Sequence, residues 1–342
     1  MWSVIKLFKL FDCNENDPLP IAAIEQLQSW GLIAKPNTLK CKNNHFLILT
    51  ENRDYADGFV WRCRKRSMVS NRKVRCDVKQ SLRKNTFFEK SHLPIWKIVI
   101  FSHLWTENVS ILFIKKQIDI ATQTVVDWAS FHREVVYDGM ILRHQKIGGE
   151  GKTVEIDESK FGRRKYHRGH RVEGQWVFGG VERETGKSFL IPVERRDKET
   201  LLVIIKDWIL PGTLIMSDCW KSYDCLKDEG YTHLTVNHSI EFKNPDTGAH
   251  TNNVEGMWRH AKASMSQYCR KKRFYAGYLA KYMFLKSCRL QNVDPLAEFF
   301  KLCSIVYDPV DGVRADVVES AESESGTDSE IESEDESQTV FF

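Results

Sequence analysis

Three acidic residues lie where carboxylates could gather around a divalent cation. Asp157 ends the β-branched stretch 153–157, Asp218 follows the apolar residues 214–217, and Glu255 lies near the start of a predicted helix. Three carboxylates in one place would repel one another and raise their pKa values, and bound cations would relieve that repulsion. Carboxylate oxygens are the hard ligands that Mg²⁺ and Mn²⁺ prefer. Two such ions can activate an attacking oxygen and stabilise a leaving oxygen in phosphodiester chemistry.

Each of these acids has a plainer interpretation when it is taken alone, because acids at strand ends often cap helices or anchor loops. Asp218, for example, precedes a predicted helix near Trp220 and could merely cap it. Two neighbouring acids, Glu158 and Asp224, are interpreted as structural, although Glu158 could replace Asp157 if the strand were aligned differently. The predicted metal site therefore depends on three acids that occur together in one order of elements.

The elements that must position these acids are predicted from residues 152–268. The predicted strands are residues 153–157, 176–181, 188–193, 213–217 and 231–236. One helix begins after Asp197 and ends at Pro211-Gly212, a second begins near Trp220, and a third is expected at 251–267. The order β-β-β-α-β-α-β-α predicts a mixed sheet covered by helices, and ligand sites in α/β sheets favour the carboxyl ends of strands.

Basic residues surround the first predicted acid. No acidic residue interrupts the cluster between Ser159 and Val172, which could hold a phosphate backbone beside the active site. The candidate DNA-binding residues are Lys160, Arg163, Arg164, Lys165, Arg168 and Arg171, together with Arg259 and Lys262 on the predicted helix of Glu255. Candidate supporting residues are His238, Asn252 and Asn253. A solvated charged loop and a structural histidine are the plainer alternatives.

The region before the sheet is predicted to be helical at both ends. One amphipathic helix is expected after Pro20, ending at Gly31. Three more are expected at 94–105, 108–116 and 122–136, with Thr122 as an N-cap. Three short helices with tight turns are compatible with a helix-turn-helix and equally with a plain helical connector.

The charge distribution favours a polyanionic partner. The net charge of the 342-residue chain is +4, but ten of its 46 acidic residues lie after residue 315, where no basic residue occurs. The remainder is strongly basic, which suits nucleic acid, although a solvated surface of mixed charges is the alternative. No apolar run is long enough for a membrane span, and the first residues lack the pattern of a signal peptide.

Four motifs resemble those of Merlin transposases and their bacterial insertion-sequence relatives. They are Val154-Glu155-Ile156-Asp157-Glu158-Ser159-Lys160-Phe161, Ile215-Met216-Ser217-Asp218-Cys219-Trp220-Lys221-Ser222-Tyr223, Val236-Asn237-His238-Ser239, and Gly248-Ala249-His250-Thr251-Asn252-Asn253-Val254-Glu255-Gly256-Met257-Trp258. The 36 residues between Asp218 and Glu255 are similar to the family's spacing. The resemblance covers about residues 40–300. It implies a ribonuclease H-like core, cut-and-paste DNA transposition with two Mg²⁺ or Mn²⁺ ions, and recognition of terminal inverted repeats.

A cysteine-rich segment resembles the zinc-ribbon region of the same family. It contains Cys41, Cys63 and Cys76, and His45 could serve as the fourth ligand of a structural Zn²⁺. The segment departs from the family in lacking a close cysteine pair, because position 44 is Asn44. A zinc site and a metal-free remnant therefore both remain open.

The predicted fold is α/β, with a ribonuclease H-like mixed sheet and flanking helices, preceded by a zinc-ribbon and a helix-turn-helix-like region. The expected segments are a helical segment at 1–40, a zinc-ribbon-like segment at 41–90, a helical DNA-binding region at 91–150, the catalytic domain at 151–310 and a disordered acidic tail at 311–342.

The leading functional hypothesis is a transposase that cleaves DNA at terminal inverted repeats and joins it to target DNA, acting as a homo-oligomer without membrane association. The alternatives are a domesticated, transposon-derived DNA-binding protein without transposition and a nuclease or resolvase of the same fold. The intact set of acids favours the enzyme. A nuclear location is expected in a eukaryote and a cytoplasmic one in a bacterium.

Overall fold

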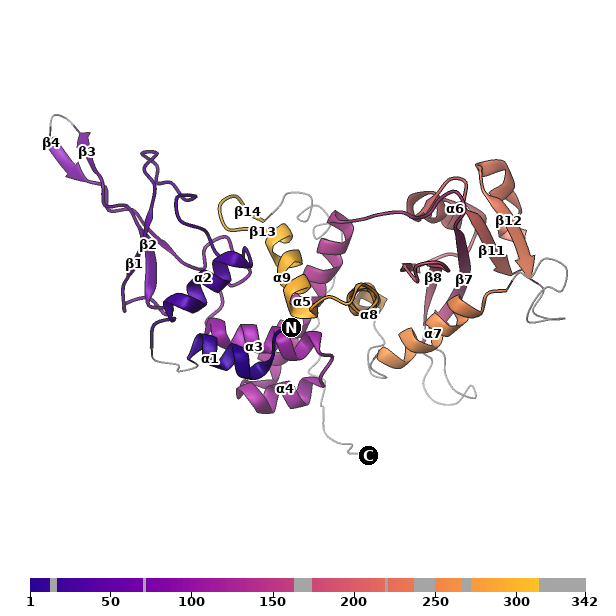
Figure 1. Ribbon diagram of the computed structural model, residues 1–342, viewed down its shortest axis with the longest axis horizontal. Coiled ribbons are helices and arrows are strands. Elements are labelled where there is room, and N and C mark those ends of the chain that lie inside the picture. The colour runs from indigo at the N-terminus through magenta and orange to yellow at the C-terminus, as the bar shows by residue number, and fades with distance from the viewer. Residues whose placement is uncertain are drawn as a thin grey trace.

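The computed structural model describes residues 1–12, 17–69, 72–162, 174–218, 221–236, 250–265 and 272–313. Figure 1 shows two lobes side by side. The first contains the N-terminal part of the chain, and the second contains the main β-sheet. Their buried apolar residues form two large, separate clusters, so each lobe has its own core.

The first lobe combines small antiparallel sheets with a group of helices. Its helices are α1 (Val4–Phe11), α2 (Ile21–Ser29), α3 (Ile95–Thr106), α4 (Ile111–Ile118), α5 (Thr122–Leu142) and α9 (Pro295–Val306). Its strands are β1 (Ile48–Glu51), β2 (Phe59–Arg62), β3 (Arg66–Val69), β4 (Arg72–Arg75), β5 (Lys79–Ser81), β13 (Tyr307–Asp308) and β14 (Gly312–Val313). Strands β1, β2 and β5 form one sheet, and β3 and β4 form a hairpin that projects from it (Figure 1).

The helices of this lobe differ from the sequence prediction in three respects. The predicted helix after Pro20 is α2, but the preceding helix α1, capped by the hydroxyl of Ser3, was not predicted. The N-cap of α5 is Ala121, so the prediction of Thr122 as the cap is wrong. Helix α5 also continues to Leu142, because its second half packs against α8 (Tyr275–Gln291) and α9, which lie far away in sequence.

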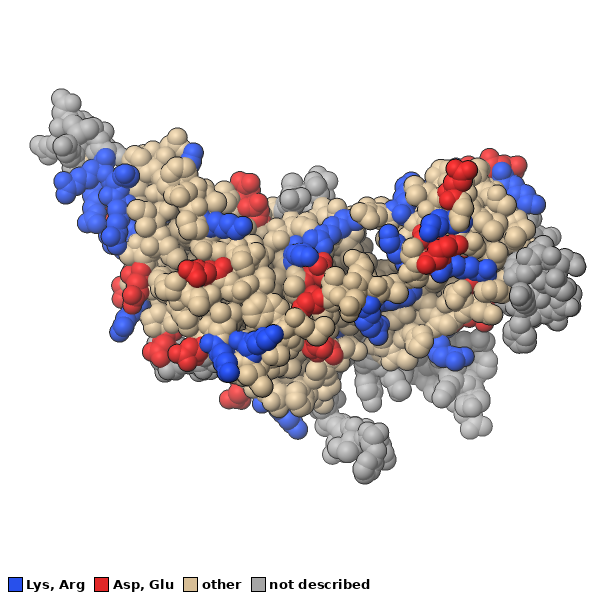
Figure 2. Space-filling view, in the orientation of Figure 1, with Lys and Arg blue, Asp and Glu red and all other residues tan. Residues whose placement is uncertain are grey.

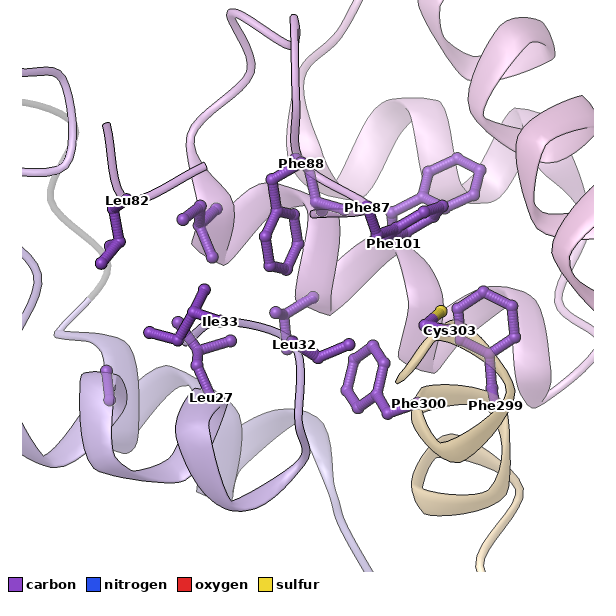
Figure 3. Packing of buried hydrophobic residues seen from close by; sticks show 14 of the residues in the cluster. Leu27, Leu32, Ile33, Leu82, Phe87, Phe88, Phe101, Phe299, Phe300 and Cys303 are labelled. Atoms are coloured by element: carbon purple, nitrogen blue, oxygen red, sulfur yellow. The ribbon is translucent and has the colours of Figure 1, made fainter. Parts of the chain in front are cut away.

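Aromatic side chains fill the core of the first lobe. Figure 3 shows Phe299 and Phe300 of α9 beside Phe87, Phe101 and other apolar side chains from the N-terminal part of the chain. Helix α8 lies between the lobes, contributing Leu279 to the core of the second lobe and Phe284 to that of the first. The predicted segment boundaries remain a prediction, but the packing shows that α9 shares a core with the helices of residues 91–142.

The second lobe is built on a five-stranded sheet. Its strands are β7 (Thr153–Phe161), β8 (Gln175–Glu182), β9 (Ser188–Val193), β11 (Leu214–Asp218) and β12 (Thr232–Val236). The spatial order is β12-β11-β7-β8-β9. Strands β7, β8 and β9 pair antiparallel, whereas β11 and β12 run parallel to β7. This is the ribonuclease H-like arrangement, so the predicted fold class is confirmed.

The remaining elements cover and complete this sheet. They are α6 (Lys198–Trp208), α7 (Asn252–Ser264), the 3₁₀ helices η2 (Lys221–Glu229) and η3 (Lys272–Phe274), and the paired strands β6 (Ile147–Gly148) and β10 (Ile209–Leu210). Asp197 caps α6 as predicted, accepting from the backbone N–H of Thr200. The helix expected near Trp220 is the 3₁₀ helix η2. None of the helices in the described ranges is both long and apolar enough to span a membrane.

A buried histidine lies at the centre of the first core. His132 of α5 is 0% exposed and stacks on Phe299, with ring centroids 4.6 Å apart. Its Nδ1 atom donates to the carbonyl of Trp128 at 2.7 Å, and Nε2 lies 2.8 Å from Oγ of Ser102. Burial in this apolar core lowers the pKa of His132 to about 3.

We expect this histidine to make the first lobe sensitive to acid. The unfolded His132 takes up a proton near pH 6.5, whereas the folded one does not until about pH 3, so stability falls as the pH drops below 6.5. Between pH 7.5 and 5.0 the contribution is about 2 kcal/mol. Urea unfolding of the wild type and His132→Phe at both pH values should show this extra loss in the wild type alone. Parallel losses in both proteins would contradict the assignment.

Candidate functional site

The first two predicted acids lie on adjacent parallel strands. Strand β11 pairs with β7 in a register that sets Met216 beside Glu155, and continuing it by two residues brings Asp218 beside Asp157. Asp157 does not end its strand, as the sequence suggested, but lies in the middle of β7. The prediction failed because β7 continues to Phe161 through pairing with β8, which local composition does not reveal.

The electrostatics of Asp157 show that all three predicted acids are neighbours. Burial, together with the negative charges of Asp218 and Glu255, raises the pKa of Asp157 to about 6. The indole Nε1 of Trp258 opposes this shift by donating to Oδ2 of Asp157 at 2.9 Å. Glu255 itself is exposed, in the first turn of α7. The sheet and α7 therefore bring the three carboxylates into one electrostatic cluster.

Glu158 adds a fourth carboxyl group to this cluster. Burial raises its pKa to about 8, and the charges of Asp157 and Asp218 contribute to the shift. Its Oε1 atom is buried and accepts no hydrogen bond from the part of the chain that the structure describes. The sequence interpretation treated Glu158 as structural or as a replacement for Asp157, whereas the structure gives both residues places at one site.

Helix α7 lies along β7, and alternate residues of the strand form hydrogen bonds with it. Glu155 accepts from the backbone of Asn253 and Val254, Asp157 from Trp258, and Ser159 from Nζ of Lys262 at 2.7 Å. Residues two apart on a strand point to the same face, and residues four apart on a helix do so as well. Two residues along the strand and four residues along the helix cover similar distances, so three successive pairs of residues can meet. These contacts place Glu255 beside the sheet.

Of the predicted basic residues that the structure describes, Lys262 lies close enough to Asp157 for the charge of that acid to act on it. Lys160 lies on β7, with Nζ 5.6 Å from the centre of the Trp176 ring. Burial lowers the pKa of Lys262, and the charge of Asp157 opposes that shift. Arg259 and Asn252 are exposed on α7. The predicted residues Arg163, Arg164, Lys165, Arg168, Arg171 and His238 lie outside the described residues.

Three residues to which the sequence interpretation gave no role organise this site, and they are Glu155, Arg183 and Trp258. Asn253, predicted to support metal or phosphate binding, donates Nδ2 to Oε1 of Glu155 at 2.8 Å. Arg183 of β8 also bonds Glu155, and Trp258 bonds Asp157. One signal was available for Glu155, which is an acid two residues before Asp157 on the same face of the predicted strand, between the apolar residues Val154 and Ile156.

The predicted cysteine and histidine ligands do come together. The ligand atoms of Cys41, His45, Cys63 and Cys76 all lie within 4.8 Å of one another. The Sγ atoms of Cys41 and Cys76 are 3.7 Å apart, and Sγ of Cys63 is 3.7 Å from Nδ1 of His45. A tetrahedral Zn²⁺ would set its sulfur ligands about 3.8 Å apart and a sulfur and a nitrogen about 3.6 Å apart. The four residues therefore fit a structural zinc ion.

The local backbone explains why His45 can replace the missing cysteine. Asn44 adopts a left-handed conformation with φ 59°, which closes a turn in which its N–H donates to the carbonyl of Cys41 at 2.8 Å. This turn carries His45 to the ligand cluster one residue beyond the position where a cysteine was expected. Cys63 and Cys76 flank the base of the β3–β4 hairpin.

One protein family and two curated proteins are similar to parts of this chain. Residues 147–284 match the family of ISXO2-like transposase domains. Male abnormal protein mab-31 of Caenorhabditis elegans is 30% identical over 153 residues, which cover 41% of this chain and 34% of that protein. An uncharacterized transposase-like protein of Haemophilus influenzae is 28% identical over 82 residues, which cover 24% of this chain and 65% of that protein.

Among solved structures, the chain is similar to the catalytic core domain of BIV integrase. Its TM-score is 0.26 at 17% sequence identity, over 38% of this chain and 80% of that chain. The chain spans only part of its curated relatives: about a third of the Caenorhabditis elegans protein and just under two thirds of the Haemophilus influenzae protein.

The proximity of Asp157 and Asp218 can be tested without any assay of activity. Because the charge of Asp218 raises the pKa of Asp157, Asp218→Asn should lower that pKa from about 6 toward the ordinary value of 3.8. Burial is the larger cause, so the shift should be partial. Carbon-13 NMR titration in EDTA would measure it, with the exposed Asp228→Asn as a control. An unchanged pKa in Asp218→Asn would contradict the pairing.

Proposed function

Residues 147–284 form a domain of the insertion-sequence DDE transposase type, and from this premise we propose that the chain cleaves and rejoins DNA. The proposed reaction is metal-dependent cleavage at terminal inverted repeats, followed by transfer of the cut end into target DNA. The observation that carries the proposal is the cluster of Asp157, Asp218 and Glu255 on β7, β11 and α7.

The donor set at this cluster fits divalent cations. The negative charges of Asp218 and Glu255 raise the pKa of buried Asp157, so neighbouring cations would relieve a repulsion that the fold imposes. The buried Oε1 atom of Glu158 offers one more oxygen without a bonding partner among the described residues. Hard oxygen donors of this kind suit Mg²⁺ and Mn²⁺.

The protein residues would divide the work of this reaction. Asp157, Asp218 and Glu255 would hold two Mg²⁺ or Mn²⁺ ions, which would activate an attacking oxygen and stabilise the leaving oxygen. Trp258 orients Asp157 through its hydrogen bond to Oδ2. Exposed Lys262 and Arg259 of α7, together with exposed Lys160 of β7, would bind phosphates of the DNA. In cleavage a water oxygen replaces the 3′ oxygen on phosphorus, and in joining the freed 3′ hydroxyl replaces a 3′ oxygen of the target.

The first lobe offers a second surface for DNA. Exposed basic side chains extend from the ligand residue Cys63 onto the β3–β4 hairpin and back to Cys76, and they are Arg64, Lys65, Arg66 and Arg75. Figure 2 shows blue side chains gathered at this end of the molecule. A hairpin with such charges is suited to binding phosphates. We assign to this lobe the recognition of the terminal repeats, with Zn²⁺ at Cys41, His45, Cys63 and Cys76 fixing the base of the hairpin.

One observation favours the alternative of a domesticated DNA-binding protein. The relative from Caenorhabditis elegans is named for abnormal males, unlike the transposase-like relative from Haemophilus influenzae. A chain that has kept the fold for such a role would bind DNA but would not transfer strands. Detection of strand-transfer products, as opposed to binding or nicking alone, distinguishes the transposase from this alternative and from a nuclease.

Replacement of an aspartate should separate the chemistry from DNA binding. Asp157→Asn and Asp218→Asn should each reduce Mg²⁺-dependent cleavage of DNA carrying the terminal repeats by about three orders of magnitude or more. Affinity for the same DNA without Mg²⁺ should change little, because the phosphate contacts use other residues. The measurements are gel assays of cleavage and fluorescence anisotropy, with Asp228→Asn as a control. Full cleavage by either variant would refute the proposed site.

Zinc analysis tests the ligand cluster of the first lobe. The purified full-length chain should carry about one zinc per molecule, and Cys63→Ser should lose it together with thermal stability of this lobe. Cys225→Ser provides the control, because Cys225 lies in the second lobe, apart from the cluster. Metal content measured by mass spectrometry decides the matter. Retention of zinc by Cys63→Ser would exclude this ligand set.

A further inference from the structure

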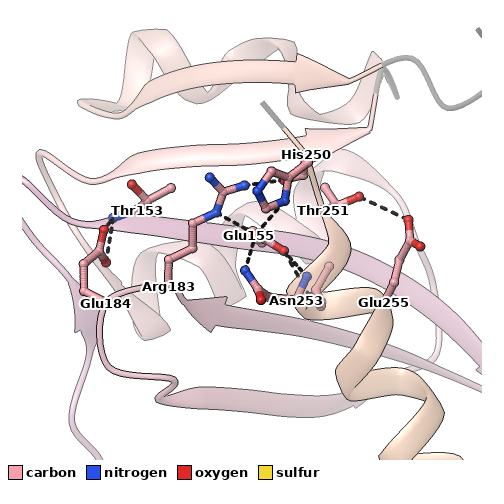
Figure 4. A network of polar contacts seen from close by, with 9 residues as sticks. Thr153, Glu155, Arg183, Glu184, His250, Thr251, Asn253 and Glu255 are labelled. Atoms are coloured by element: carbon pink, nitrogen blue, oxygen red, sulfur yellow. Dashed lines mark hydrogen bonds and ion pairs between the residues drawn. The ribbon is translucent and has the colours of Figure 1, made fainter. Parts of the chain in front are cut away.

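A buried carboxylate joins the strand of Asp157 to the helix of Glu255. Glu155 of β7 is 0% exposed. Its oxygens accept from the backbone N–H groups of Asn253 at 2.8 Å and Val254 at 3.1 Å, and from Nδ2 of Asn253 at 2.8 Å. Arg183 of β8 donates Nε to the same carboxylate at 2.6 Å (Figure 4). Glu155 therefore links three elements of the second lobe.

Helix α7 begins without a side-chain cap from its own N-cap residue, so its first N–H groups depend on Glu155. The N-cap residue Thr251 makes no side-chain capping bond, and its hydroxyl instead donates to Oε1 of Glu255 at 3.3 Å. The first N–H groups of a helix need acceptors, and a negative charge near them is favourable. Glu155 supplies both from a neighbouring strand. The start of α7 is therefore fixed to β7 rather than to the chain that precedes it.

Arg183 fixes the other side of the same carboxylate. Besides bonding Glu155, its Nη2 atom donates to the backbone carbonyl of His250 at 2.6 Å. Nδ1 of His250 lies 3.4 Å from Oε1 of Glu155. One guanidinium thus holds both the carboxylate and the chain that leads into α7, as Figure 4 shows.

The position of Glu155 in the sequence connects these hydrogen bonds to the two acids Asp157 and Glu255 of the proposed metal site. It lies two residues before Asp157 on the same face of β7, and Val254, whose backbone N–H donates to Glu155, immediately precedes Glu255. We propose that Glu155, held by Arg183, is a positioning residue that sets the separation of Asp157 and Glu255 and thereby the affinity of the site for divalent cations. This inference rests on the proposed metal-dependent function.

A purely structural role makes a different prediction from a positioning role. If Glu155 only balances the charge of Arg183, replacing both residues by neutral ones should restore whatever is lost when Glu155 alone is replaced. If Glu155 positions α7, the double replacement should restore stability but not metal affinity, because no carboxylate then anchors Asn253 and Val254. The two roles are therefore distinguished by the variants Glu155→Gln and Glu155→Gln/Arg183→Met.

Mn²⁺ binding to the full-length chain, followed by electron paramagnetic resonance, provides a measure that is independent of cleavage. We expect Glu155→Gln and the double variant each to bind Mn²⁺ about 10–100-fold more weakly than the wild type, the usual effect of removing a group that orients a metal ligand. The melting temperature should fall in Glu155→Gln and recover in the double variant. Cleavage should need correspondingly more Mn²⁺ in both.

Glu184→Gln is the matched control. Glu184 is also a carboxylate bonded to backbone on β7, but it accepts from the N–H of Thr153 at the end remote from Asp157. Its replacement should leave Mn²⁺ affinity unchanged. If Glu155→Gln unfolds the chain, Asn253→Ala, which removes only the Nδ2 bond, should still weaken Mn²⁺ binding.

The outcomes separate this inference from the function on which it rests. A wild type that binds no Mn²⁺ and cleaves no DNA would overturn both the metal site and the role of Glu155. Normal binding and cleavage by the wild type, with wild-type Mn²⁺ affinity in Glu155→Gln or restored affinity in the double variant, would overturn the positioning role alone.

Discussion

The packing of α7 along β7 is the constraint on which the second lobe depends. Two residues of a strand advance about 6.8 Å and four residues of a helix about 6 Å, so alternate strand residues can meet successive turns. Here Glu155, Asp157 and Ser159 contact the N-terminus, the middle and the last turn of α7. A shift of one residue in β7 would turn all three away from the helix. The register of β7 against α7 therefore determines which side chains meet at the site, more than the identity of any one acid does.

The two lobes are joined by packing as well as by the chain. Helix α8 contributes to both cores, and α5 lies so close to α9 that a Cβ at Gly139 would be 2.9 Å from Cβ of Leu302. Any larger residue at Gly139 would force these helices apart. Because α9 follows the second lobe in sequence but packs in the first, the proposed DNA-binding lobe completes its core only after the second lobe has been synthesised.

The sequence predicted the elements of the second lobe well because their signals are local. Alternation and a hairpin marked β8 and β9, and Asp197 marked the start of α6. The four zinc-ligand candidates were also identified, although a C-x₂-C pair was missing. What could not be predicted depends on distant partners. Strand β7 passes Asp157 because β8 pairs with it, and α5 passes Val136 because α8 and α9 support it.

The anchoring role of Glu155 was missed for the same reason, since nothing near it in sequence shows that Arg183 and Asn253 will reach it. Those contacts also explain how a basic protein can keep an acidic site available to cations. Arg183 is directed to Glu155, and Lys262, although close enough to Asp157 to affect its electrostatics, donates to Ser159. Within the described residues neither forms an ion pair with Asp157, whose side chain accepts a hydrogen bond from the neutral indole of Trp258. Separating cationic side chains from Asp157 in this way leaves its charge available to the proposed metal ions, while exposed basic residues remain available to the phosphates of the proposed DNA substrate.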